Sequence, residues 1–416
     1  MAMRSSLANR KTNLRVGAWL LMVVACFCLA FIRARAQQDS KQQRPRRVGN
    51  TQPSKAQPTP EAARPTEPGE EVGEGDVVRV ETQLVSVPAV VTDSAGRPLA
   101  GLRAENFRLF ENGQPQAISN FATMEAPFEV ALLLDTSGST RADVQLIRRA
   151  ASLFIDSLRA GDRVAIVSFN VLREDKDTLA TVEVKTPLTS DRVRLRTALD
   201  TVGASNGTPF YDALERISDE VFAEPAREEV SGRRAIVALT DGVDSSSDAE
   251  FAEVRARLMR AGVTCYFIQV NTEDYVEERL MRDCSDFGTL RLSRTQLQRY
   301  RKIFVPRAPA GDYSNFCELG PFERMKISRD LYTLARTEMA DLARSSGGKT
   351  FDAADLRDAR SAFAQVANEI GTQYSLGYYP TNKARDGRFR AIRVELKGVA
   401  RGAQVRAREG YYAQKE

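Results

Sequence analysis

Residues 128–139 read FEVALLLDTSGS, and this stretch decides the fold class. Residues 128–134 form an apolar run, which a strand buried on both faces of a sheet requires. A D-x-S-x-S motif, residues 135–139, follows at once, at the carboxyl end of that strand. Open α/β sheets bind their ligands along this edge. The stretch therefore predicts a core strand that ends in a polar binding loop.

The segments that follow alternate between strand and helix patterns. We expect buried strands at 163–169, 234–240 and 264–270, an edge strand at 181–188, a last strand from 349, and helices at 141–158, 191–202, 211–222, 249–261, 331–344 and 356–370. Alternation of this kind predicts an α/β fold with a doubly wound, mainly parallel sheet. We assign this domain to residues 126–371.

Three segments do not follow the alternation. Residues 271–330 hold charged clusters, prolines and two cysteines, and we interpret them as an insertion between a strand and its helix. Residues 77–125 and 372–416 have the period of two that strands show, and the last strand is expected at 405–411. Because each of these end segments is too short for a good core, we expect them to pack together as a small β unit.

Two further segments place polar side chains near the first motif. The strand expected at 234–240 is followed by Asp241, which puts a second carboxylate on the same edge of the sheet. Thr208 lies in a loop just before the helix expected at 211–222. Because the carboxyl ends of parallel strands meet at one edge, these side chains are expected near Asp135.

The D-x-S-x-S motif, the loop with Thr208 and the strand end with Asp241 follow one another in this order along the chain. Together they resemble the von Willebrand factor A (vWA) domain with its metal-ion-dependent adhesion site. The resemblance implies that Ser137, Ser139 and Thr208 supply hydroxyl ligands to the metal. It implies that Asp135 and Asp241 act mainly through hydrogen bonds and water. The whole layout is similar to a bacterial, acidobacterial-type group of exported proteins with a variant of this domain.

The chemistry of these side chains agrees with that resemblance. Mg²⁺ prefers hard oxygen ligands and keeps some of its waters, and Mn²⁺ or Ca²⁺ are alternatives. Neutral hydroxyls leave the cation partly unneutralised, so that it can still bind a carboxylate. We therefore expect a non-enzymatic adhesion module that captures a protein partner through a partner Glu or Asp.

Composition narrows the classes of function. The 416 residues include no histidine, which excludes Ser-His-Asp and Cys-His nucleophiles and the usual histidine-based zinc sites. Of 60 basic residues six lie in residues 1–36, so that 54 basic face 55 acidic residues in the remainder. A chain so close to neutral has no general attraction to nucleic acid, and we expect no such partner.

Two other functions remain open at this stage. A magnesium-dependent phosphohydrolase could use Asp135 as its nucleophile, although such chemistry favours a second Asp where this chain has Ser137. A structural or assembly protein could use the metal only to tie loops together.

The five cysteines lie in three parts of the chain. Cys26 and Cys28 lie in an N-terminal apolar stretch, and Cys265 lies in an expected strand, where a buried thiol is typical. Cys284 and Cys317 flank the loop-rich insertion. In an oxidising compartment these two could form a disulfide, and two free thiols are the alternative.

The N-terminus has the parts of a secretory signal. A basic start precedes an apolar run at 16–32, and Ala-Arg-Ala at 34–36 offers a cleavage site before Gln37. An uncleaved membrane anchor or a lipidated Cys26 are the alternatives. Residues 37–76 carry six prolines and almost no large apolar residues, as a disordered linker does. We therefore expect export to the periplasm, the cell surface or the medium, with membrane contact only through an uncleaved N-terminus.

Overall fold

The computed structural model describes residues 84–123, 126–137, 144–174, 177–227, 230, 232–285 and 290–415. The expected signal or anchor at 1–36, the linker at 37–76 and the start of the first β segment lie outside the described residues. Ser139 of the D-x-S-x-S motif lies outside them too. In the described part of the chain, no helix is long and apolar enough to cross a membrane.

The α/β domain is built on a six-stranded sheet with the strand order β10-β9-β8-β5-β6-β7. Adjacent strands run parallel except for β7, which is antiparallel to β6 at the edge of the sheet. The strands are β5 (Glu129–Leu134), β6 (Arg163–Glu174), β7 (Asp177–Thr189), β8 (Arg234–Thr240), β9 (Thr264–Val270) and β10 (Lys349–Ala353). The expected fold class is therefore confirmed.

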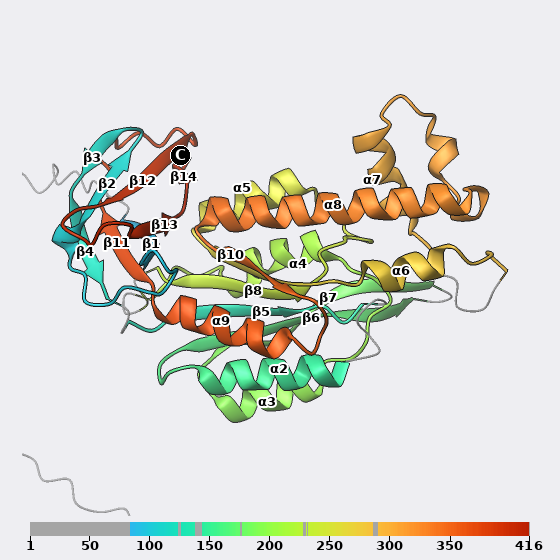
Figure 1. The fold of residues 1–416 in the computed structure, drawn as a ribbon, viewed down its shortest axis with the longest axis horizontal. Helices are drawn as coiled ribbons and strands as arrows, with labels where there is room; N and C mark the ends of the chain where they lie inside the picture. The colour runs from blue at the N-terminus through green and yellow to red at the C-terminus, as the bar shows by residue number, and fades with distance from the viewer. Residues whose placement is uncertain are drawn as a thin grey trace, which may run out of the picture. The chain divides into compact units, whose positions relative to one another are not determined.

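Helices cover both faces of this sheet, as Figure 1 shows. One hydrophobic core joins the sheet to α2 (Val144–Ser157), α3 (Arg192–Asp200) and α9 (Ala359–Gly371). The other joins it to α4 (Phe210–Arg216), α5 (Phe251–Ala261) and α8 (Pro321–Ser346). Because β5 and β8 are buried along their whole length, both faces of each strand contribute to a core.

One charged residue interrupts the apolar run of β5. Glu129 is fully buried, and its two carboxylate oxygens bind Arg163 at 2.8 Å and Arg234 at 2.9 Å. Burial of an ionised carboxylate is costly unless it is paired and hydrogen-bonded, as Glu129 is here. The three residues begin adjacent strands in register, so this ion-pair group lies at the amino edge of the sheet, opposite to the predicted site.

The small β unit consists of two four-stranded antiparallel sheets, β13-β1-β11-β4 and β14-β12-β2-β3. Each sheet combines strands from before and after the α/β domain, for example by pairing Val87 with Leu376 and Glu111 with Ile392. The strands are β1 (Val85–Thr92), β2 (Phe107–Glu111), β3 (Gln114–Gln116), β4 (Ile118–Ala122), β11 (Tyr374–Tyr378), β12 (Phe389–Leu396), β13 (Gln404–Ala407) and β14 (Gly410–Tyr412). The expected packing of the two end segments is thus observed.

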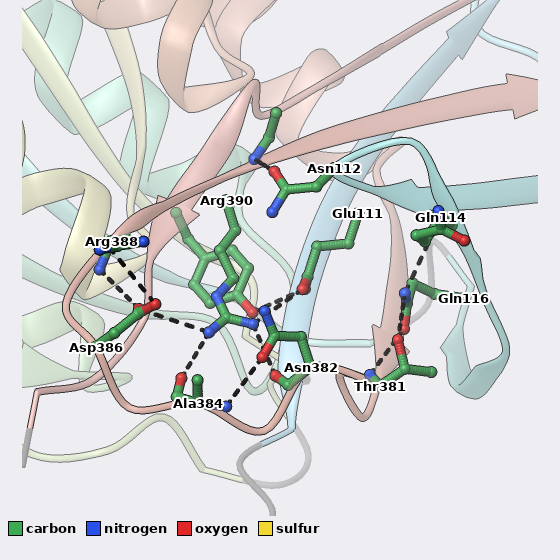
Figure 2. Close-up of polar contacts among 12 residues, drawn as sticks. Glu111, Asn112, Gln114, Gln116, Thr381, Asn382, Ala384, Asp386, Arg388 and Arg390 are labelled. Atoms are coloured by element: carbon green, nitrogen blue, oxygen red, sulfur yellow. Dashed lines mark hydrogen bonds and ion pairs between the residues drawn. The ribbon is translucent and has the colours of Figure 1, made fainter.

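A polar group lies inside this β unit (Figure 2). Glu111 and Arg390 are almost fully buried and form an ion pair at 3.2 Å. Tyr378 and Tyr411 donate hydrogen bonds to the same carboxylate, and Arg390 also donates to the carbonyl of Ala384. All these polar groups have partners, so we interpret the group as a structural link between β2, β11, β12 and β14.

The prediction of one strand at 405–411 is wrong in one respect. Two strands, β13 and β14, occupy the region and belong to different sheets. Between them the buried guanidinium of Arg408 donates to the carbonyls of Gly410 and Met259. Strand pairing therefore ends at Ala407 and resumes at Gly410, where the chain passes from one sheet to the other.

The insertion is mostly helical and has its own small core. It contains α6 (Glu273–Leu280) and α7 (Arg294–Phe304), which pack with α8 around a hydrophobic cluster that includes Leu280, Leu297 and Leu331. Helix α8 begins at Pro321, ten residues before the predicted start, because proline is well suited to the first turn of a helix. Cys284 and Cys317 form a disulfide with their Cα atoms 5.8 Å apart.

Candidate metal-binding site

The candidate site lies where the loops after β5 and β8 meet the loop before α4. Asp135 directly follows β5, Asp241 directly follows β8, and Thr208 lies two residues before α4. Hydrogen bonds tie the three loops together. The amide of Ser205 donates to the carbonyl of Thr136 at 2.8 Å, and the amide of Ser245 donates to the carbonyl of Thr208 at 3.0 Å.

Asp135 is held from both sides and has no solvent exposure. One of its oxygens accepts from the amide of Ser137 at 2.9 Å, and the other accepts from the hydroxyl of Thr240 at 2.6 Å. Burial, and then the nearby carboxylate of Asp241, raise the pKa of Asp135 to about 7. The two carboxylates are therefore close enough to repel each other when both are ionised.

Asp241 is oriented by two different donors. Its Oδ1 accepts from the amide of Val243 at 3.0 Å, and its Oδ2 accepts from the hydroxyl of Thr272 at 2.6 Å. The Thr272 hydroxyl also lies 2.7 Å from the phenol oxygen of Tyr332. Burial and the charge of Asp241 raise the pKa of Tyr332 well above 10.0, so that the phenol keeps its proton at neutral pH.

Thr208 is positioned by the loop that follows Asp241. The amide of Thr208 donates to the hydroxyl of Ser245 at 2.8 Å. Nearby, the buried carboxylate of Asp244 accepts from the amides of Phe210 at 2.9 Å and Tyr211 at 3.3 Å. Because these amides open α4, Asp244 caps that helix from a different loop. The loop after β8 thus fixes both Asp241 and the Thr208 segment.

The structure gathers four of the five predicted site residues at one edge of the sheet. Asp135, Ser137, Thr208 and Asp241 are each at most 5% exposed. Ser139, the fifth, is outside the described residues. In the described segments, no group of three or more His, Cys, Asp or Glu side chains is placed to hold a metal ion. The polar side chains gathered here are two carboxylates and the hydroxyls of Ser137 and Thr208.

This donor set fits a hard divalent cation. All four side chains offer oxygen, which Mg²⁺ prefers to nitrogen or sulfur. Burial, and then repulsion by Asp241, raise the pKa of Asp135, and a bound cation would favour the ionised form of both carboxylates. The site residues present in the structure therefore suit the ion that the sequence predicts.

Sequence reasoning missed several residues that shape the site. Thr272 follows β9 by two residues, and β9 adjoins β8, so the same carboxyl-edge argument would have found it. Thr240 and Asp244 lie beside Asp241 in the chain, where a polar loop gave a signal. Tyr332 gave none, because its place at the site depends on how α8 packs against the sheet.

Comparisons with known proteins agree with this layout. The family model for the von Willebrand factor type A domain matches residues 129–288, which run from β5 into the insertion. A search of curated proteins gave no match.

Three solved structures illustrate the similarity. Proximal thread matrix protein 1 from the mussel byssus is 16% identical, with a TM-score of 0.38, over 67% of this chain and 51% of that one. This chain therefore spans about half of the mussel protein. BatB, a conserved hypothetical protein from Bacteroides thetaiotaomicron, is 17% identical, with a TM-score of 0.36. The match covers 58% of this chain and 97% of BatB. A von Willebrand factor type A protein from Catenulispora acidiphila is 12% identical, with a TM-score of 0.37. The match covers 81% of this chain and 75% of that protein.

The domain assignment rests on the family match and on the six-stranded sheet, most of which lies within the matched residues. Strands β5, β6, β7, β8 and β9 all lie within the matched residues, and α8, β10 and α9 complete the domain after the insertion. The chain carries a von Willebrand factor type A domain, and the candidate site lies on it.

Proposed function

We propose that this chain is an exported binding module that captures a protein partner through a divalent cation at the Asp135–Asp241 site. Domains of this type typically mediate protein–protein interaction or adhesion. The observation that carries the proposal is the convergence of two buried carboxylates with Ser137 and Thr208 at the carboxyl edge of the sheet. Mg²⁺ is the preferred ion, with Mn²⁺ or Ca²⁺ as substitutes.

The chemistry of the donors suggests how binding works. The hydroxyls of Ser137 and Thr208 would hold the cation directly, and Asp135 and Asp241 would act mainly through hydrogen bonds and water. When bound, the cation supplies an electrophilic position for an anionic ligand. Because neutral hydroxyls offset little of its charge, a carboxylate from a partner Glu or Asp suits that position.

Two observations favour binding over the alternatives. Asp135 is fully buried and both of its oxygens accept hydrogen bonds, which suits a positioned carboxylate better than a nucleophile for phosphoryl transfer. The three loops are already tied by the bonds from Ser205 to Thr136 and from Ser245 to Thr208. These bonds connect the loops through protein atoms, which favours a cation that serves a ligand over one that serves only to tie loops.

Export is supported by the sequence features of the N-terminus and by the disulfide between Cys284 and Cys317. Disulfides persist mainly in oxidising compartments such as the periplasm and the cell exterior.

The experiment is affinity capture from an envelope extract of the source organism. Immobilised protein is incubated with the extract in Mg²⁺ or in EDTA, beside Asp135→Ala and a control, Asp200→Ala, which changes an exposed residue at the end of α3. We expect a partner that is retained in Mg²⁺ by the parent and by the control only. Equal retention in EDTA, or by Asp135→Ala, contradicts the proposal.

A further inference from the structure

The two ends of the insertion meet beside the candidate site. Thr272 is the second residue after β9, where the insertion begins, and Tyr332 lies on α8, just after it ends. Both side chains are buried, with 7% and 4% exposure. The hydroxyl of Thr272 is 2.6 Å from Asp241 Oδ2 and 2.7 Å from the Tyr332 phenol. Residues on either side of a long insertion are thus in contact with each other and with a site carboxylate.

Counting protons gives these hydrogen bonds a direction. The hydroxyl of Thr272 donates its single proton to Oδ2 of Asp241. The oxygen of Thr272 is then left to accept, and Tyr332 must be the donor to it. The result is a chain of donors that runs from Tyr332 through Thr272 to Asp241. Bonds in such a chain polarise and strengthen one another.

A second contact joins the insertion to the other half of the site. The hydroxyl of Ser293, at the start of α7, donates to the carbonyl of Ser245 at 2.6 Å. Ser245 in turn accepts from the amide of Thr208 through its side chain, at 2.8 Å. The insertion therefore touches the surroundings of both Asp241 and Thr208.

From this geometry we propose that Thr272 and Tyr332 are positioning residues, through which the insertion sets the cation affinity of the site. The proposal rests on the proposed function, since it assumes that the site binds a cation. The amide of Val243 donates to one oxygen of Asp241, and the hydroxyl of Thr272 donates to the other. Without the hydroxyl of Thr272, Oδ2 of Asp241 loses a donor that helps to set the orientation of the carboxylate.

The expected effect follows from the behaviour of groups that orient metal ligands. Loss of such a partner typically weakens metal binding by about 10- to 100-fold. Thr272→Val keeps the shape of the side chain but removes the donor, so the affinity of this variant for the cation should fall by a factor in that range. Tyr332→Phe leaves the Thr272–Asp241 hydrogen bond in place, so the affinity for the cation should fall less in this variant. Thr272→Ser restores the hydroxyl and should bind within a few-fold of the parent.

The test is calorimetric titration of full-length protein with Mn²⁺, with thermal unfolding in EDTA measured on the same samples. Two matched controls make the same chemical changes elsewhere. Thr264→Val removes a buried hydroxyl that has no hydrogen-bond partner among the described residues, at the opposite end of β9. Tyr300→Phe removes a buried phenol from α7. Both controls should bind Mn²⁺ as the parent does.

The outcomes separate this inference from the function on which it rests. If the parent binds no Mn²⁺, the proposed function fails and the inference falls with it. If the parent binds Mn²⁺ and Thr272→Val binds equally well, only the inference is overturned. A lower unfolding temperature without a change in affinity assigns Thr272 and Tyr332 a structural role and also overturns it. Should Thr272→Val not fold, Tyr332→Phe and Thr272→Ser decide by the same affinities.

Discussion

The raised pKa of Asp135 predicts that the metal-free protein loses stability as the pH rises. The pKa is about 7 in the folded protein, against an ordinary value of 3.8. Between these values the folded state binds a proton that the unfolded state has released, so stability falls with increasing pH. One pH unit is worth about 1.4 kcal/mol, which makes the whole loss on the order of 4 kcal/mol.

Asp135→Asn should remove this dependence, because its amide does not titrate. About 3 kcal/mol of the loss falls between pH 5 and pH 8, on the same scale of about 1.4 kcal/mol per unit. Urea unfolding in EDTA gives the free energy of unfolding of parent and variant at both pH values. The change between pH 5 and pH 8 is then compared between the two proteins. Other buried carboxylates with raised pKa values, such as Asp162 and Asp244, cancel in that comparison. Equal pH dependence in the two proteins would refute the reasoning.

Three further predictions concern the ligands, the insertion and the N-terminus. Ser137→Ala and Thr208→Ala should each weaken Mg²⁺ binding less than Asp135→Ala does, because each removes one neutral ligand that water can replace; calorimetry ranks the three, and a larger loss in either alanine variant contradicts the assignment. Cys284 and Cys317 should be joined in the exported protein, and mass mapping without reductant that finds both alkylated is the opposing result. The mature chain should begin at Gln37, so N-terminal sequencing that finds Met1 on a membrane-bound form supports an anchor instead.

The fold class could be predicted from the sequence because β5 and its neighbours are apolar on both faces. The same argument located Asp135 and Asp241, since the ends of parallel strands share one edge. The helix start at Pro321 could have been predicted too, because proline after Gly320 is a signal for the first turn of a helix.

Other features depend on contacts that no local pattern records. Glu129 lies inside an apolar run, and only the registered arginines on the two neighbouring strands explain its burial. At the break between β13 and β14, Arg408 donates a hydrogen bond to the carbonyl of Met259, which lies far away in the sequence. Tyr332 reaches the site only because α8 packs beside it, and the 3.6-residue period of a helix does not specify its partner.

The central claim is that a divalent cation binds between the loops that carry Asp135, Thr208 and Asp241. Calorimetric titration of the parent and of Asp135→Ala with Mn²⁺, at pH 7.5 in one buffer, tests it most directly. The account predicts one cation per parent chain and none in Asp135→Ala. The variant should still unfold cooperatively, since Asp135 follows the end of a strand and its loss opens no large apolar cavity. A parent that binds no cation, or a folded Asp135→Ala that binds it as tightly, would contradict the account.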